Sequence, residues 1–406
     1  MVANHPAIES KIFEIANSLS NFRFTSPLLF GGSAGASLFY HSLYSLTGNS
    51  RYFQISQDIL LATIKQLNET SFRYTMSEGY AGIFWFIQYC QQNGLIDIED
   101  NYFDEAEALI YGASIRDLNK GHYDYLHGGL SPVLFALRRY PKDAAGTYLD
   151  RVVSALKKTK IEDFDGIRWE DKFSQFSRPF EGAMFNLSLS HGVTSVINLL
   201  LRIYELGVRR ATISHLLEGS LSWLTKCKIG DETMASIYPN CSFGNCRHNN
   251  GTSRLSWCYG DMGIAWTFLL ASRILKEDVY RNEALRIIEK ASRRTEPLSD
   301  PNFDAAFCHG ASGIAYLFKR FYKETELAIC MRAHSFWLSQ TLGMANNSQE
   351  CAGFKFYKPL GQKKWSVDYG LLEGLAGVGL VLIDNLIDFN EWDECMLVSA
   401  KNLNYR

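Results

Sequence analysis

The sequence predicts an all-α fold, an α/α toroid of seven inner and seven outer helices. A tetrapeptide of the form Gly-x-x-Gly, or a near variant, occurs seven times at steps of 47 to 68 residues. A repeat with such a period is typical of an architecture built from copies of one unit. Each copy opens a strongly apolar run, and amphipathic segments lie between the copies. Because helices that are apolar most of the way round are buried ones, the alternation predicts a closed ring with the buried helices inside.

The seven glycine motifs are numbered here as copies 1 to 7. They begin at Gly32, Gly79, Gly128, Gly192, Gly260, Gly310 and Gly374. Copies 3 and 4 end in Ser131 and Ser195 where glycine is usual, which we expect to alter packing more than chemistry. Since glycine has no Cβ, neighbouring inner helices and the turns before them can approach closely. The repeat also gathers seven helix N-termini near one rim, where the residues just before the glycines should converge.

Four stretches with a polar face are predicted as outer helices, because their apolar residues recur every three or four positions. They are residues 148–158, 213–226, 282–294 and 326–340. Three long connectors interrupt the repeat, at residues 162–186, 228–254 and 345–368. Loops of this length in a compact fold are usually functional or disordered. Since each connector leads into a glycine motif, we predict that they form walls or lids over a cleft, with a small β insertion in one of them.

The composition is that of an ordinary globular protein, and the repeat favours a single domain over residues 1–406. Apolar residues make up 47% of the chain, charged residues 21%, and the net charge is −2. A nucleic-acid-binding protein normally has a clear basic excess, so nucleic acid is not an expected partner. No apolar run approaches the roughly 20 residues that span a bilayer, and residues 1–6 do not begin a signal peptide. Nine scattered cysteines, an odd number, indicate reduced thiols rather than a disulfide framework.

Copies 3 to 6 carry candidate metal ligands or acids just before their glycines. They are Asp124 and His127, His191, Cys258, and the adjacent Cys308 and His309. Two thiolates and one imidazole with an open fourth position form the ligand pattern of a catalytic zinc ion. Taken alone, each residue has a simpler explanation, since cysteine packs well as a small hydrophobic residue. Their joint occurrence at equivalent places in the repeat favours metal binding.

The motifs around these residues resemble those of the lanthionine synthetase C family. They are Trp-Cys-Tyr-Gly at 257–260, Cys-His-Gly at 308–310, Ser-His-Gly at 190–192 and Asp-Tyr-Leu-His-Gly at 124–128. The first two are highly specific, whereas the glycine pairs alone are not. The resemblance covers all seven copies and implies an α/α toroid that acts as the zinc-dependent cyclase of class I lanthipeptide (lantibiotic) biosynthesis.

The resemblance also implies a metal centre, one zinc ion bound by Cys258, Cys308 and His309. In the family, the metal binds a cysteine thiol of a dehydrated precursor peptide. The thiolate adds to a dehydroalanine or dehydrobutyrine and closes a lanthionine or methyllanthionine ring. Zinc lowers the pKa of a bound thiol enough to hold it as thiolate at neutral pH. Two cysteine ligands donate charge to the metal, which should keep the substrate sulfur nucleophilic.

Four further residues match active-site positions of the family. His191 matches the acid that protonates the enolate left by the addition, a role that suits histidine because its pKa lies near the working pH. Asp124 and Arg254 are expected to form an ion pair that orients groups around the zinc, and Tyr259 matches a tyrosine beside the metal. The simpler alternatives are a helix cap for His191, a loop carboxylate for Asp124 and a structural ion pair for Arg254. His127 is a rival acid or a fourth ligand.

Other functions stay open on the sequence alone. The eukaryotic lanthionine synthetase C-like proteins share the motifs and are associated with glutathione, so the main alternative is a zinc- and glutathione-binding thiol-addition or interaction protein. The two specific motifs argue against a zinc prenyltransferase β-subunit, another α/α toroid. A glycoside-processing toroid would need paired carboxylates, for which only Glu78 and Glu373 before copies 2 and 7 come into question. Cys241, Cys246 and His248 fit no common zinc spacing, which favours loop thiols.

The expected partners follow from the reaction. The seven copies take up the chain and leave no room for a dehydratase or kinase-like domain, so dehydration is assigned to a separate enzyme. We expect the chain to meet a leader-bearing, dehydrated precursor peptide and this dehydratase, in a complex that can include an exporter. The predicted location is the cytoplasm, with attachment to the inner face of the membrane through that complex.

Overall fold

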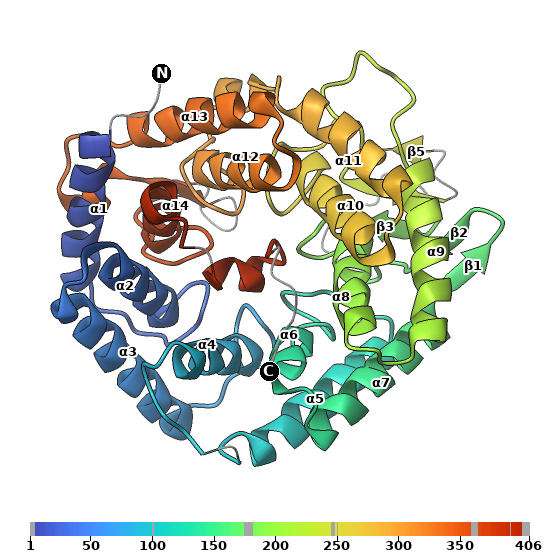
Figure 1. The fold of residues 1–406 in the computed structure, drawn as a ribbon, viewed down its shortest axis with the longest axis horizontal. Coiled ribbons are helices and arrows are strands. Elements are labelled where there is room, and N and C mark those ends of the chain that lie inside the picture. The colour runs from blue at the N-terminus through green and yellow to red at the C-terminus, as the bar shows by residue number, and fades with distance from the viewer. Residues whose placement is uncertain are drawn as a thin grey trace. The chain divides into compact units, whose positions relative to one another are not determined.

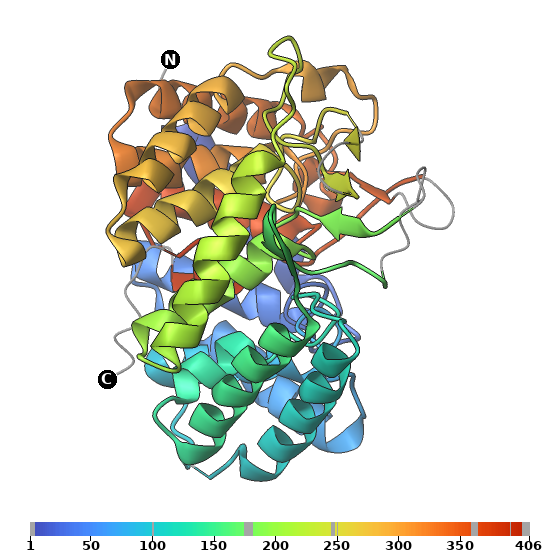
Figure 2. The same cartoon turned by 90° about the vertical axis from the view of Figure 1, so that its right-hand side faces the viewer.

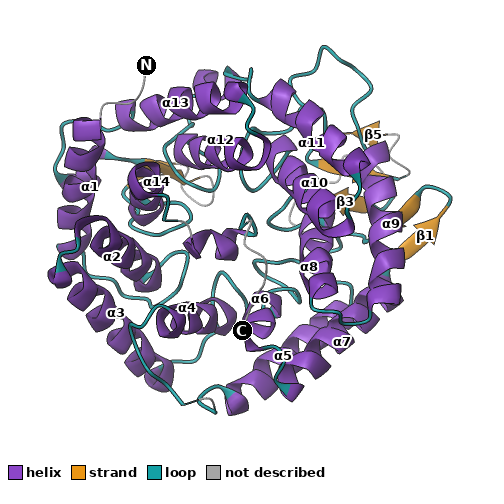
Figure 3. Cartoon of the chain, viewed as in Figure 1, coloured by secondary structure: helices purple, strands orange, loops and turns teal. Residues whose placement is uncertain are grey.

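A computed structural model describes residues 5–99, 101–173, 182–244, 248–249, 251–358, 364–389 and 391–399. Most of this described chain is helical, with a few short strands (Figure 3). It forms two compact units. Unit 1 comprises residues 1–73, 77–98 and 292–396, and unit 2 comprises residues 74–76, 99–291 and 397–406. Each unit thus combines segments that are distant in the sequence, and the organisation as a single domain stays a prediction.

Unit 1 alternates helices that follow a glycine motif with amphipathic helices (Figure 1). The first kind comprises α2 (Ser33–Thr47), α4 (Tyr80–Gln92), α12 (Ala311–Thr325) and α14 (Leu375–Ile387), and the second kind comprises α1 (His5–Ser20), α3 (Ser50–Glu69) and α13 (Ala328–Gly343). In α14 every residue from 375 to 384 is buried. In α13 only one face is buried, including Cys330 and Trp337. Helix α13 therefore covers α12, while α14 packs between α1, α2 and α12.

Three short 3-10 helices complete the helical part of unit 1: η1 (Glu296–Ser299), η2 (Glu350–Gly353) and η3 (Glu391–Met396). Helix η3 carries two buried carboxylates into the core. Glu394 accepts a hydrogen bond from Trp85 Nε1 of α4 at 2.8 Å, and Asp393 accepts one from the Tyr316 hydroxyl of α12 at 2.9 Å. Because buried carboxylates are costly unless they are hydrogen-bonded, these contacts fix η3 between α4 and α12.

Unit 2 repeats the same alternation. Its helices are α5 (Asp104–Asn119), α6 (Val133–Arg139), α7 (Asp143–Thr159), α8 (Val193–Glu205), α9 (Arg210–Lys226), α10 (Asp261–Leu275) and α11 (Asp278–Ala291). The apolar helices α8 and α10 pack on each other and are covered by α9 and α11. The four predicted outer segments correspond to α7, α9, α11 and α13, although α11 ends at Ala291, before the expected 294, and α13 begins at Ala328, after the expected 326. Among the described residues, no helix is both long enough and apolar enough to cross a membrane.

Strands occur in all three long connectors, not in one as predicted. Strands β1 (Ile161–Asp163) and β2 (Gly166–Arg168) form a hairpin, as do β6 (Phe356–Lys358) and β7 (Lys364–Ser366). Strands β3 (Met184–Asn186), β4 (Cys241–Phe243) and β5 (His248–Asn249) form one antiparallel sheet, which joins two connectors of unit 2 (Figure 2). Strand pairing gives these long connectors partners for their backbone hydrogen-bonding groups.

The first glycine is the N-cap of the helix that follows in six of the seven copies. A Cβ there would overlap the residue six positions earlier, as with Asn186 before Gly192 and Asp304 before Gly310. Glycine is thus needed because the chain folds back on its own preceding turn. Copy 3 differs from the expected pattern, because Pro132 is the N-cap of α6 and the helix begins only at Val133.

Candidate functional site

An aspartate–histidine pair lies at the start of α8 in unit 2. Nδ1 of His191 is 2.8 Å from Oδ2 of Asp124. The second oxygen of Asp124 accepts hydrogen bonds from the backbone N–H groups of Leu126 and His127, at 2.7 and 2.8 Å. The backbone N–H of His191 donates to Ser188 Oγ at 2.9 Å. Both members of the pair are therefore fixed by turns that lead into glycine motifs, as the repeat predicts.

The pair favours its charged form. Burial works to lower the pKa of His191, but the charge and hydrogen bond of Asp124 outweigh it, so the pKa is raised. Burial likewise works to raise the pKa of Asp124, and the charge of His191 outweighs it, so that pKa is lowered. An imidazole whose pKa is raised, with one nitrogen held by a carboxylate, is arranged to donate a proton from the other nitrogen.

Two more of the predicted residues contact the His191 ring. His127 stacks on it with ring centroids 5.6 Å apart and an angle of 8° between the planes. The ring of Tyr259 lies 5.9 Å from it on a tilted plane. Burial raises the pKa of the Tyr259 phenol, so this group stays protonated. His127, His191 and Tyr259 therefore form one aromatic cluster, which His191 joins to Asp124.

Behind Tyr259 lies a polar network that sequence reasoning missed. Nδ2 of the fully buried Asn186 is 3.5 Å from the Tyr259 hydroxyl and 3.1 Å from Oδ2 of Asp171. Its Oδ1 accepts from the backbone N–H of Ser188 at 3.0 Å. Asn186 stands six residues before Gly192, the position on which each glycine turn folds back. That spacing was the signal that could have drawn attention to it.

Cys258 is buried in the same unit, and its backbone supports the turn that carries His191. Its carbonyl oxygen accepts from Leu189 N at 3.1 Å and from Ser190 Oγ at 3.3 Å, and its Sγ lies 3.6 Å from Ser256 Oγ. Two residues later Gly260 has a φ of +84°, a left-handed backbone that suits glycine.

Arg254 departs from the expectation. Its side chain is exposed, and among the described residues no ion pair joins it to Asp124, whose partner is His191. The turn before Gly260 instead uses the backbone of Arg254, since its carbonyl oxygen occupies the space that a Cβ of Gly260 would need. The predicted catalytic role of Arg254 stays a prediction.

Cys241 was expected to be a loop thiol. It is buried in β4, and burial raises its pKa to about 12, which makes it a poor thiolate ligand. Cys246 lies outside the described residues.

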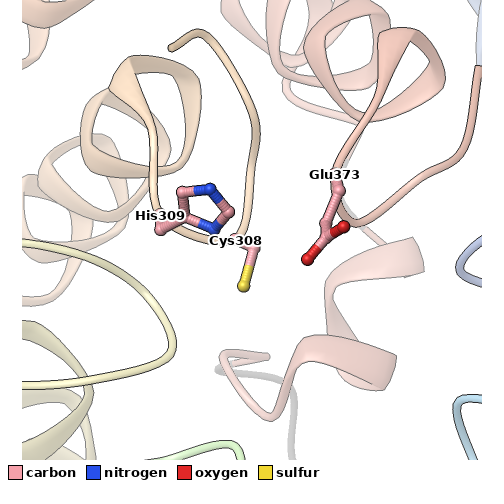
Figure 4. A group of neighbouring side chains, drawn as sticks. All are labelled: Cys308, His309 and Glu373. Atoms are coloured by element: carbon pink, nitrogen blue, oxygen red, sulfur yellow. The ribbon is translucent and has the colours of Figure 1, made fainter. Parts of the chain in front are cut away.

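In unit 1, Cys308 and His309 meet a carboxylate that was not predicted as a ligand. One donor atom from each of Cys308, His309 and Glu373 lies within 4.8 Å of the other two (Figure 4). Cys308 and His309 lie just before α12, and Glu373 lies just before α14. A thiolate, an imidazole and a carboxylate are the three kinds of ligand that zinc takes in proteins, so the donor set fits this metal.

A buried carboxylate stands beside His309. Oδ2 of Asp304 is 4.0 Å from His309 Nε2, and it accepts a hydrogen bond from the backbone N–H of Tyr357 in β6 at 2.9 Å. Burial raises the pKa of Asp304, although the nearby His309 opposes this. A carboxylate behind a histidine is a frequent support of metal-binding imidazoles. Asp304 stands six residues before Gly310, as Asn186 does before Gly192.

The predicted site residues thus fall into two groups that the structure describes separately. Unit 2 brings together Asp124, His127, His191 and Tyr259, with Cys258 supporting the turn that carries His191. Unit 1 brings together Cys308 and His309. On the sequence, Glu373 comes into question only as a glycosidase carboxylate together with Glu78. In the structure, Glu78 pairs with Arg73 at 3.4 Å.

Comparison with known proteins gives two matches of note. Residues 24–397 match the family described as lanthionine synthetase C-like protein. Among solved structures, nisin cyclase aligns with a TM-score of 0.75 at 17% identity over 96% of each chain. This likeness confirms the predicted fold class, the all-α, α/α toroid.

More distant likenesses have TM-scores below 0.5. An unsaturated glucuronyl hydrolase from Streptococcus agalactiae has a TM-score of 0.47 at 9% identity, over 100% of this chain and 95% of that one. A family 88 glycosyl hydrolase from Bacteroides vulgatus has 0.43 at 14% identity, over 97% and 99%. No curated protein matches the sequence.

Proposed function

Because the chain belongs to the lanthionine synthetase C-like family, we propose that it is a lanthipeptide cyclase. It joins a cysteine thiol of a dehydrated peptide to a dehydroalanine or dehydrobutyrine and so forms a lanthionine or methyllanthionine ring. The observation that carries the proposal is the grouping of the Cys308 and His309 donor atoms in unit 1. Both residues belong to Cys-His-Gly, one of the two highly specific motifs of the resemblance.

The proposed cofactor is one zinc ion, held by Cys308 and His309. Cys258 is the further proposed ligand, and its part rests on the sequence resemblance alone. When bound, zinc lowers the pKa of a thiol in its coordination sphere, so that a substrate cysteine is present as thiolate near neutral pH.

His191 is the proposed acid of the reaction. Formation of the C–S bond pushes the π electrons of the dehydroamino acid toward its carbonyl, and the resulting enolate must gain a proton at Cα. Asp124 accepts from Nδ1 of His191 and raises its pKa, which leaves the Nε2–H to be donated. The thiol proton lost at the start goes to solvent, and the neutral imidazole takes up a proton from solvent afterwards, so the cycle balances.

The proposed partners follow from this reaction. The substrate is a precursor peptide with a leader, and a separate dehydratase must supply its dehydroamino acids. An exporter is a further proposed member of the complex.

The test measures zinc stoichiometry and thioether formation on a dehydrated, cysteine-containing peptide. We expect one zinc per chain in the wild type, and loss of both zinc and ring closure in Cys308→Ala. Cys330→Ala is the control, because it removes another buried thiol of unit 1, on α13, and should keep both. Zinc binding without cyclisation of any peptide would favour the glutathione-binding alternative, and a wild type without zinc would refute the proposed site.

A further inference from the structure

Cys308, His309 and Glu373 form the candidate metal-binding cluster of unit 1. Glu373 is the member of this cluster to which the motif resemblance gives no role. Its oxygen, Cys308 Sγ and a His309 ring nitrogen lie within 4.8 Å of one another. Figure 4 shows the Glu373 carboxylate and the Cys308 sulfur pointing into the same space. The side chain is partly exposed, at 45%, so a ligand could reach it from solvent.

The backbone places this carboxylate beside the two predicted ligands. The N–H of Cys308 donates to the carbonyl of Leu372 at 2.9 Å, which ties the turn before α12 to the turn before α14. A Cβ on Gly377 would lie 3.3 Å from the Cβ of Phe307, so the segment before α12 also lies close to the first turn of α14. The turn that carries Glu373 is therefore joined to the turn that carries Cys308 by a backbone hydrogen bond.

A lysine from the third connector orients the side chain. Nζ of Lys358, at the end of β6, lies 3.0 Å from Oε2 of Glu373 and 2.6 Å from Oδ2 of Asp368. The neighbouring Tyr357 N–H binds Asp304, the carboxylate beside His309. Strand β6 thus contacts Glu373 through Lys358 and, through Tyr357, the carboxylate that lies beside His309. Since a carboxylate has two oxygens, the ion pair through Oε2 leaves Oε1 able to bind a metal.

We propose that Glu373 is a ligand of the metal bound by Cys308 and His309 while no substrate is bound, at the coordination position that the substrate thiol later takes, and that Lys358 is the positioning residue that holds its carboxylate. This inference rests on the proposed function, because it requires metal binding at these two residues. Zinc accepts carboxylate oxygen beside thiolate and imidazole, so Glu373 completes a donor set of three kinds within unit 1. The proposal also gives the third connector a function, because Lys358 of this connector orients the metal ligand Glu373.

The test measures zinc affinity of the full chain by competition with a chromophoric chelator, and the visible spectrum after loading with Co²⁺. We expect Glu373→Gln to weaken zinc binding by more than about 10-fold and to change the Co²⁺ bands. Lys358→Met should weaken it by about 10-fold, the lower end for residues that support a metal ligand, and Lys358→Arg should restore most of it. Circular dichroism shows whether each variant is folded.

Glu78→Gln is the matched control, since Glu78 holds the equivalent position before copy 2 and pairs with Arg73. It should bind zinc like the wild type. If the wild type binds zinc and Glu373→Gln matches it in affinity and Co²⁺ spectrum, this inference is wrong while the proposed function stands. An equal loss in Glu78→Gln would also overturn it. If the wild type binds no metal, the proposed function itself fails.

Discussion

The imidazole of His191 and the carboxylate of Asp124 form a hydrogen-bonded ion pair, with Nδ1 and Oδ2 2.8 Å apart. The two residues are 67 positions apart in the sequence, and each precedes the glycine motif of its own copy. The repeat therefore does more than build helices, because it brings side chains of successive copies into contact. In this pair the contact sets the proton affinity of the candidate acid.

Asp124→Asn should lower the pKa of His191, because the amide keeps the shape of the carboxylate but loses its charge. The high-pH limit of kcat for ring closure should then move to lower pH, since the imidazole loses its proton earlier. The pKa can be followed by NMR of the His191 ring, and kcat by mass spectrometry of the thioether product. Asp150→Asn, at an exposed aspartate of α7, is the control. An unchanged pH limit in Asp124→Asn would contradict the role of the pair.

The same substitution should cost stability within a defined pH window. His191 has a raised pKa, so its contribution is complete below the unfolded value of about 6.5 and is lost as the pH rises through the folded value. Asp124 has a lowered pKa, so its contribution is present above about 3.9 and is lost as the pH falls. Between pH 4 and 6.5, the free energy of unfolding of Asp124→Asn should be about 1–3 kcal/mol lower than that of the wild type. Urea unfolding across this range measures it, and a difference independent of pH would argue against an ion pair.

Asn186→Ala should destabilise unit 2 and release Tyr259. The substitution leaves Asp171 and the backbone N–H of Ser188 without their amide partner in a buried place. Losing such partners costs about 1–3 kcal/mol. Urea unfolding monitored by circular dichroism tests this. Asn119→Ala is the control, since among the described residues its amide binds only the carbonyl of Ile115 in its own helix, and an equal loss there would contradict the prediction.

How far the sequence could predict the site depends on the separation of the residues. The adjacent Cys308 and His309 were predicted as ligands because they are neighbours in a specific motif. Glu373 was not, although it stands directly before Gly374 as His309 stands before Gly310, because the motif resemblance gives it no role and its contact with them depends on the backbone hydrogen bond from the Cys308 N–H to the Leu372 carbonyl. The partner of Asp124 was expected to be Arg254, but side-chain pairing depends on where each turn points its side chain. Arg254 uses its carbonyl oxygen in the turn and exposes its side chain.

The fold was easier to predict, because burial patterns repeat along each helix. Periodicity identified α7, α9, α11 and α13, since one face of each is apolar. It could not identify β3 and β4, because each has three residues and forms only by pairing across about 55 positions of the chain. The late start of α6 was also missed, although Pro132 was a visible signal for it.

Gly79→Ala should destabilise the protein although alanine is the better helix former. Gly79 has an extended backbone, but a Cβ would collide with the carbonyl group of Arg73. The obstacle is backbone, which cannot move aside as a flexible side chain would, so a cost of about 1–3 kcal/mol is expected. Gly31→Ala is the control, because a Cβ there meets nothing within 4 Å. Equal stability of the two variants in urea unfolding would show that the turn tolerates a side chain.

Zinc should stabilise the folded protein through Cys308 and His309. A ligand that binds only the folded state raises the free energy of unfolding by about 2.7 kcal/mol when its free concentration is 100 times its Kd. Unfolding in urea, with zinc at that concentration and then with a chelator, measures this difference. In Cys308→Ala the difference should fall to a small fraction, because one donor of the cluster is gone. The Cys330→Ala control should keep the full difference. If the wild type unfolds identically with saturating zinc and with chelator, the metal does not bind the folded chain in preference to the unfolded one. The proposed zinc centre would then have to be abandoned.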